Sequence, residues 1–177
     1  MRPPLFPSRL SRLLPRRLPG GTAQLLTALL VAGCADYAVT FNERTLYTPP
    51  ALFGDFTLAD EPLRECVTQH IIDGRITSAE ALTLLDCSHA GITELAGLEV
   101  FTGLTRVRLS GNAIEDVTPL AAATGLEILL LANNRIVDPA PLFALEALER
   151  LDLSGNDRMT CPSARLMIAE LKLPEHC

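Results

Sequence analysis

The chain has 177 residues and a formal net charge of −6, which leaves room for one ordinary domain with its tails. Five of its 15 basic residues are arginines at positions 2, 9, 12, 16 and 17, so the remainder carries 10 basic against 21 acidic residues, a net of −11. A chain this acidic repels phosphates, which excludes nucleic acid as a partner and opposes adsorption to anionic lipid headgroups.

Residues 1–33 predict a secretory signal peptide. A basic segment with no acidic residue is followed by the uncharged apolar stretch "GGTAQLLTALLVAG" and a small-residue exit. The apolar stretch is too short to span a bilayer as a stable helix. The alternatives are a disordered basic arm and a mitochondrial transit peptide; prolines at positions 3, 4, 7, 15 and 19 oppose the amphipathic helix that a transit peptide needs.

Cys34 ends the sequence "VAGC", which resembles the lipobox of bacterial lipoproteins. This resemblance implies that Cys34 is acylated, becomes the first mature residue and holds the protein at a membrane through its lipid. Ala35, in place of the Asp that retains enteric lipoproteins in the inner membrane, favours the outer membrane, with the protein facing either the periplasm or the surface. Residues 34–56 are expected to form a tether, although their aromatic residues indicate that part of it lies against the next segment.

Residues 57–81 predict an N-terminal helical cap. Asp60 is the expected N-cap, Pro62 lies in the first turn and Gly74 is the expected stop. One face of this helix carries the residues expected to pack inward, which are Leu63, Cys66, Val67, His70 and Ile71.

Residues 82–159 contain four repeats, which begin at Leu82, Leu104, Leu126 and Leu148, always 22 residues apart. Their frame, L-x-x-L-x-L-x-x-N-x-I, resembles the leucine-rich repeat family, in the 22-residue class of internalin-type bacterial surface proteins. In each unit the fourth and sixth residues alternate with positions expected to face outward, as in a strand, and later apolar residues recur every third position, as in a 3₁₀ helix. We therefore predict an α/β solenoid with a parallel β-sheet on its concave face and a 3₁₀ or irregular convex side.

Asn112, Asn134 and Asn156 occupy the same position in successive repeats. In leucine-rich repeats this side chain points inward and bonds backbone groups of the turn, so these residues are expected to be structural.

Residues 160–177 predict a C-terminal cap, in which the helix-like stretch "SARLMIAELKL" separates Cys161 from Cys177. Without Cys34, four cysteines remain, and an even set in an exported protein suggests two disulfides. The number of cysteines alone leaves three possible pairings. The resemblance to bacterial leucine-rich proteins whose caps are each closed by one disulfide implies the pairs Cys66 with Cys87 and Cys161 with Cys177.

The concave sheet face is where leucine-rich repeat proteins usually bind protein partners, so the resemblance implies an unidentified protein as the partner. Neighbouring strands set side chains about 5 Å apart, so Arg108 is expected to pair with Asp86. Ile128 and Leu130 are expected either to form an exposed apolar centre or to be ordinary strand residues shielded by the arginine stems. The complete predicted set is Leu84, Asp86, Arg106, Arg108, Ile128, Leu130, Arg150 and Asp152. The alternative is a structural envelope lipoprotein whose repeats only form a stable body.

Catalysis is not expected, because the histidines at positions 70, 89 and 176 form no triad or ligand spacing with other residues. The stretch "DGRITSAEA" matches half of a calcium-binding loop, but Gln69 and Ile71 stand where the first carboxylates belong. We therefore predict a monomer that is not an enzyme and holds no cofactor or metal.

Overall fold

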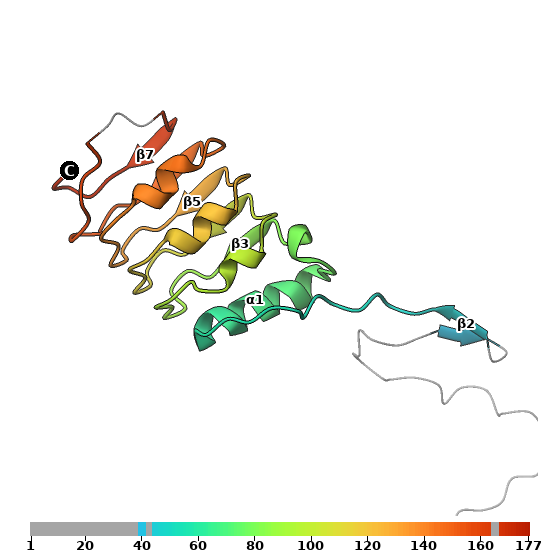
Figure 1. Ribbon diagram of the computed structural model, residues 1–177. Coiled ribbons are helices and arrows are strands. Elements are labelled where there is room, and N and C mark those ends of the chain that lie inside the picture. The colour runs from blue at the N-terminus through green and yellow to red at the C-terminus, as the bar shows by residue number, and fades with distance from the viewer. Residues whose placement is uncertain (1–38, 42–43, 164–166) are drawn as a thin grey trace, which may run out of the picture. The chain divides into compact units, whose positions relative to one another are not determined.

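The computed structural model describes residues 39–41, 44–163 and 167–177, in two compact units, Met1–Thr48 and Pro49–Cys177. In the first unit, β1 (Val39–Phe41) and β2 (Arg44–Tyr47) form an antiparallel two-stranded sheet (Figure 1). The predicted signal peptide and Cys34 lie outside the described residues. Among the described residues, no helix has the length and apolar character needed to cross a bilayer.

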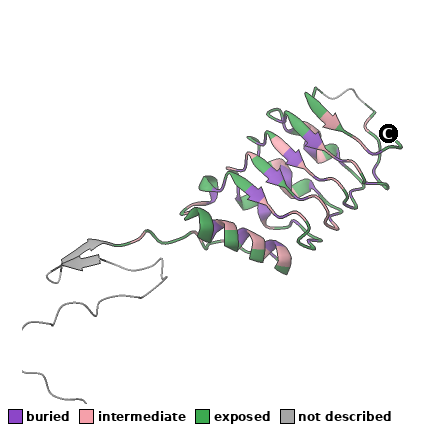
Figure 2. Cartoon of the chain, turned by 180° about the vertical axis from the view of Figure 1, so that it is seen from behind, coloured by how far each residue is buried: buried purple, intermediate pink, exposed green. Residues whose placement is uncertain are grey.

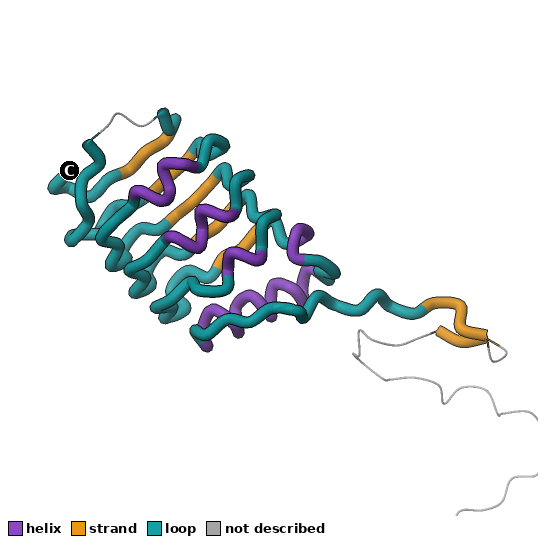
Figure 3. The backbone as a smooth tube through the Cα atoms, viewed as in Figure 1, coloured by secondary structure: helices purple, strands orange, loops and turns teal. Residues whose placement is uncertain are grey.

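The second unit is a solenoid that begins with one helix, α1 (Glu61–Gly74). Each repeat then adds one short strand that pairs in parallel with the next in register. These strands are β3 (Leu84–Asp86), β4 (Arg106–Arg108), β5 (Ile128–Leu130) and β6 (Arg150–Asp152). The 3₁₀ turns are η1 (Ala79–Ala81), η2 (Leu98–Val100), η3 (Thr118–Ala122) and η4 (Ala140–Ala144). The strands line one side of the solenoid and η2 to η4 line the other (Figure 3), so the predicted leucine-rich repeat architecture is confirmed.

A fifth strand, β7 (Glu170–Lys172), extends the sheet beyond the last repeat. The Glu170 N–H donates to the Glu149 carbonyl at 2.9 Å, and the Leu153 N–H donates to the Lys172 carbonyl at 2.8 Å. The expectation of a helical character here is wrong for the described residues of this segment. The open edge of β6 offers unpaired backbone groups, and pairing with them outweighs a weak local helix preference.

The core is a stack of aliphatic side chains, one layer per repeat. In the strands β3 to β6, the middle residue points inward and is fully buried, whereas its neighbours face outward, as the alternating colours of the strands show in Figure 2. These buried residues are Leu85, Val107, Leu129 and Leu151. Because a single repeat cannot cover this apolar face, stacking is what makes the units stable.

The repeated asparagines bond the backbone of neighbouring turns, as predicted. Asn156 is fully buried; its amide Nδ2 donates to the carbonyls of Leu131 and Leu153, at 3.0 and 2.8 Å, and its Oδ1 accepts from the Ile136 N–H at 3.0 Å. Asn134 makes equivalent bonds one repeat earlier. Every polar atom of these buried amides is therefore satisfied, and each side chain ties its own repeat to the one before it.

The residue before each asparagine position has a left-handed backbone, with φ of 58° at His89, 74° at Gly111, 56° at Asn133 and 71° at Gly155. Large and small residues alternate in this column. A Cβ on Gly111 would collide with the His89 ring, and a Cβ on Gly155 would collide with the Asn133 amide. The missing space therefore requires glycine at both positions, and the positive φ, which His89 and Asn133 tolerate, also favours it.

Asp60 joins the cap helix to the first repeat. Its Oδ1 accepts from the Leu63 N–H at 2.9 Å, as an N-cap does, and its Oδ2 accepts from the backbone N–H groups of Thr93 and Glu94, at 2.9 and 3.2 Å. At the other end the helix includes Gly74, the expected stop, but the left-handed residue is Arg75, with φ of 50°.

Part of the predicted tether packs against the folded body. The rings of Phe53 and Phe56 lie 6.0 and 5.4 Å from the ring of Phe101, measured between centroids, and the Phe53 N–H donates to the Ile76 carbonyl at 2.8 Å. The aromatic residues that argued against a pure spacer are therefore part of the solenoid's first layer.

Candidate protein-interaction face

The outward side chains of the sheet form two columns that cross all five strands in register. We call these two columns the concave face. The first column is Leu84, Arg106, Ile128, Arg150 and Glu170, and the second is Asp86, Arg108, Leu130, Asp152 and Lys172. The structure thus brings the eight predicted residues together on one surface and adds two, Glu170 and Lys172, which the sequence interpretation missed because it did not predict β7.

Three ion pairs connect neighbouring strands on this face. Arg108 pairs with Asp86 at 3.3 Å between Nη1 and Oδ2, as expected from the sequence. The two pairs that involve β7 join Arg150 to Glu170 at 2.6 Å and Lys172 to Asp152 at 3.4 Å. All three are exposed enough that each contributes little to stability, on the order of 0.2–1 kcal/mol.

The carboxylates of Asp86 and Asp152 are held in place by the serines that follow the strands. Oδ1 of Asp152 accepts from the Ser154 hydroxyl at 2.6 Å, and Oδ1 of Asp86 accepts from the Ser88 hydroxyl at 2.8 Å. Partial burial alone would raise the pKa of both aspartates, but the bonds from the serines and the neighbouring Arg108 or Lys172 together lower each pKa below its usual value. Both groups therefore carry a fixed negative charge at neutral pH.

The apolar centre of the face is partly shielded, which was one of the two expectations from the sequence. Ile128 and Leu130 are half-buried, because β5 is the middle of five strands and longer side chains flank it on both sides. Leu84, on the first strand, is 49% exposed. A hollow of about 110 Å³ opens beside Leu130, with the two ion pairs of β7 around it.

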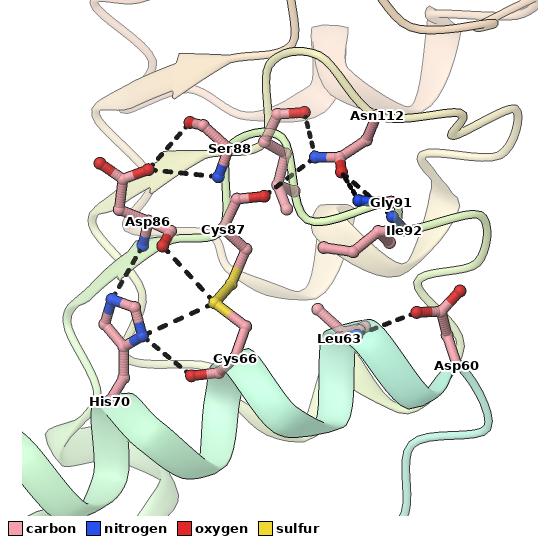
Figure 4. The surroundings of a disulfide bond; sticks show 11 residues. Asp60, Leu63, Cys66, His70, Asp86, Cys87, Ser88, Gly91, Ile92 and Asn112 are labelled. Atoms are coloured by element: carbon pink, nitrogen blue, oxygen red, sulfur yellow. Dashed lines mark hydrogen bonds between the residues drawn. A yellow bond between two sulfur atoms is a disulfide. The ribbon is translucent and has the colours of Figure 1, made fainter.

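The first disulfide, Cys66–Cys87, fixes the edge of this sheet to the cap helix (Figure 4). His70, one turn after Cys66, completes the junction. Its Nδ1 donates to the Cys66 carbonyl at 2.9 Å, and its Nε2 accepts from the Asp86 N–H at 3.2 Å. The outer edge of β3 is thus occupied by a side chain of α1, a role for His70 that no local sequence signal indicates.

The second disulfide, Cys161–Cys177, closes the opposite end, and both of its cysteines are exposed. The two pairings are those implied by the family resemblance. Each disulfide lies beside a histidine, His70 or His176, with the candidate ligand atoms within 4.8 Å of one another. Both sulfurs in each group are bonded to each other, so neither group offers a thiolate to a metal ion.

No protein-family model matches the chain, and no curated protein matches it. Among solved structures, it is similar to an internalin (inlF) from Listeria monocytogenes str. 4b F2365, with a TM-score of 0.54 and 25% identity over 59% of this chain and 32% of that one. The chain has an internalin-like leucine-rich repeat fold. Internalin C2 (inlC2) from the same strain gives a TM-score of 0.53 and 21% identity over 59% of this chain and 48% of that one. The chain spans between a third and a half of the length of these two internalins.

Proposed function

We propose that this internalin-like solenoid binds a protein partner through its concave face. The observation that carries the proposal is the composition of that face, with half-buried Ile128 and Leu130 at the centre and charged side chains around them. An apolar centre inside a polar rim is the usual anatomy of a protein interface. Because no large aromatic anchor lies in the two columns, we expect affinity to come from several modest contacts.

We further propose that the protein is a lipoprotein of a bacterial cell envelope, acylated on Cys34 and held by that lipid at the outer membrane, facing either the periplasm or the surface. The basic and apolar leader and the "VAGC" sequence support this proposal. The two disulfides support it as well, because disulfides persist in oxidising compartments outside the cytoplasm.

An alternative is a structural envelope protein with no concave ligand. The three ion pairs favour it, because charges that already satisfy one another offer less to a partner. We propose no catalytic role, since the internalin-like fold is generally non-enzymatic.

Crosslinking in native envelopes tests the interaction. The protein would be compared with a double variant, Ile128→Asp and Leu130→Asp, and with a matched control, Val100→Asp and Val137→Asp, which changes two aliphatic residues outside the sheet, 38% and 47% exposed. Melting curves of all three would verify folding. We expect the control to capture the same partner as the unmodified protein and the concave variant to lose it. The same partner captured by a folded concave variant would contradict the proposal and favour the structural alternative.

A further inference from the structure

The concave face has the opposite charge balance to the rest of the protein. It holds four basic residues (Arg106, Arg108, Arg150, Lys172) and three acidic ones (Asp86, Asp152, Glu170), a net of +1. The whole chain after Arg17 has 10 basic and 21 acidic residues, which leaves 6 against 18 elsewhere. A negatively charged partner is therefore repelled by most of the surface and favoured only at the sheet, which orients its approach.

Arg106 differs from the other charged residues of the concave face. Arg108, Arg150 and Lys172 each have an acidic partner on the neighbouring strand, whereas Arg106 makes no ion pair within the described residues. Its neighbours in the first column are Leu84 on β3 and Ile128 on β5. An exposed guanidinium between two aliphatic side chains can accept a carboxylate in a bidentate geometry while its partner's chain lies on apolar surface.

The second feature of the concave face is the hollow beside Leu130. Its volume of about 110 Å³ suits one aliphatic side chain, and the Leu130 side chain gives it an apolar wall. The ion pairs Arg150 to Glu170 and Lys172 to Asp152 form its other walls, so they exclude water from a side chain that enters it.

The distance between Arg106 and the hollow determines which ligand could occupy both at once. Arg106 lies on β4, and the hollow lies over β5 to β7, about two strands further along the sheet. Two strand spacings are about 10 Å. A peptide extended in the polyproline II conformation rises about 3.1 Å per residue and turns once every three residues, so side chains three positions apart are separated by about this distance and face the same side.

We propose that the concave face binds an extended segment of a partner protein in which an acidic residue lies three positions from an aliphatic one, with the carboxylate on Arg106 and the aliphatic side chain in the hollow. This inference rests on the proposed function, since it names the chemistry of the partner at the same surface. The internal ion pairs then serve recognition by shaping the hollow, and Arg106 supplies the charge that selects the ligand.

A selection from displayed peptides tests this inference directly. The probe is a library of random peptides of about twelve residues, long enough to cross all five strands when extended. It would be selected against the disulfide-intact chain, against Arg106→Glu, against the Ile128→Asp and Leu130→Asp variant, and against Arg158→Glu. Arg158 is exposed and lies outside the sheet, so its reversal makes the same change in net charge as the reversal of Arg106.

We expect the unmodified chain and Arg158→Glu to enrich peptides with Asp or Glu three positions from Leu, Ile or Val. Arg106→Glu should instead enrich Lys or Arg at the acidic position, and Arg106→Gln should weaken a selected acidic peptide by roughly three- to five-fold, as for an exposed ion pair. Peptides that depend on Ile128 and Leu130 but show no acidic position would overturn this inference and leave the proposed function standing. Peptides that bind all variants equally, or no enrichment at all, would overturn it as well, and the envelope crosslinking would then decide the proposed function separately.

Discussion

The two ends of the solenoid solve the same problem by different means. At the N-terminal end, α1 buries Leu63, Val67 and Ile71 and a disulfide whose Cys87 is 2% exposed. At the C-terminal end, β7 leaves Leu171 half-buried, and both cysteines of the disulfide face solvent. The first end is held mainly by apolar burial and the second mainly by backbone pairing and a covalent link, so we expect local opening to begin at the second.

Truncation of one leucine at each end gives the largest contrast. Leu63→Ala removes a fully buried side chain from α1 and is expected to lower the free energy of unfolding by about 3 kcal/mol. Leu171→Ala, at a half-buried position, should cost about 1 kcal/mol. Urea denaturation of both variants measures this difference. Equal losses would show that the C-terminal strand is as deeply packed as the helix, and the contrast between the ends would fail.

Removal of each disulfide sharpens the comparison, because the sequence separations, 21 and 16 residues, are similar. Loop entropy alone predicts about 3 kcal/mol for either bond. We expect the loss of Cys66–Cys87 (C66A with C87A) to cost at least that amount, and the loss of Cys161–Cys177 (C161A with C177A) to cost less, since its release frees only the terminal strand.

Chemical reduction separates the same two bonds by accessibility. A dithiol should reduce the exposed Cys161–Cys177 bond first, and alkylation followed by mass spectrometry would record the order. Reduction of Cys66–Cys87 first would mean that the N-terminal cap opens more readily than its burial implies.

The smallest effect concerns the acid stability of the N-terminal cap. Partial burial alone would raise the pKa of Asp60, but hydrogen bonds from Thr93, Leu63 and Glu94 outweigh it and lower this pKa below its usual value. A carboxylate whose pKa is lower in the folded state stabilises the protein above its unfolded pKa of about 3.9, and this contribution is lost as the pH falls through the folded value.

Asp60→Asn replaces one carboxylate acceptor with an amide donor that opposes the Thr93 and Glu94 N–H groups. At pH 7 we expect the free energy of unfolding of Asp60→Asn to be about 1 kcal/mol below that of the unmodified protein. As the pH falls from about 5 to about 2, the variant should lose less stability than the unmodified protein does. Thermal melts across this range, with Asp55→Asn as an exposed control on the same segment, measure the effect. Parallel pH profiles for Asp60→Asn and the unmodified protein would contradict it.

The contrast between the ends also explains what the sequence could predict. The four strands from β3 to β6 follow from an apolar pattern that repeats every 22 residues, so each one supports the register of the others. β7 has no such support. Ile168 and Leu171 are spaced as in a helix, and only the free edge of β6 makes the segment a strand.

The concave face shows the same division between repeated and non-repeated residues. The positions of the eight concave-face residues on β3 to β6 follow from the register of the repeats, whereas the positions of Glu170 and Lys172 depend on β7. Without β7, Arg150 and Asp152 would have no ion-pair partner on a following strand. The contrast between the paired Arg150 and Arg106, which makes no ion pair among the described residues, can therefore not be deduced from the repeats alone. The contact of His70 with the edge of β3 likewise depends on the position of the whole helix and not on neighbouring residues.

The alternation of His89, Gly111, Asn133 and Gly155 limits which repeats could be duplicated to lengthen the solenoid. Its period is two repeats, or 44 residues, although the leucine pattern has a period of 22. Duplication of residues 126–147 alone would place one Asn133 directly against a copy of itself, where a glycine is needed. Duplication of residues 104–147 keeps every large residue beside a small one. A duplication could therefore add residues 104–125, whose column residue is Gly111, or the pair of repeats 104–147 without a collision in this column, but not residues 126–147 alone.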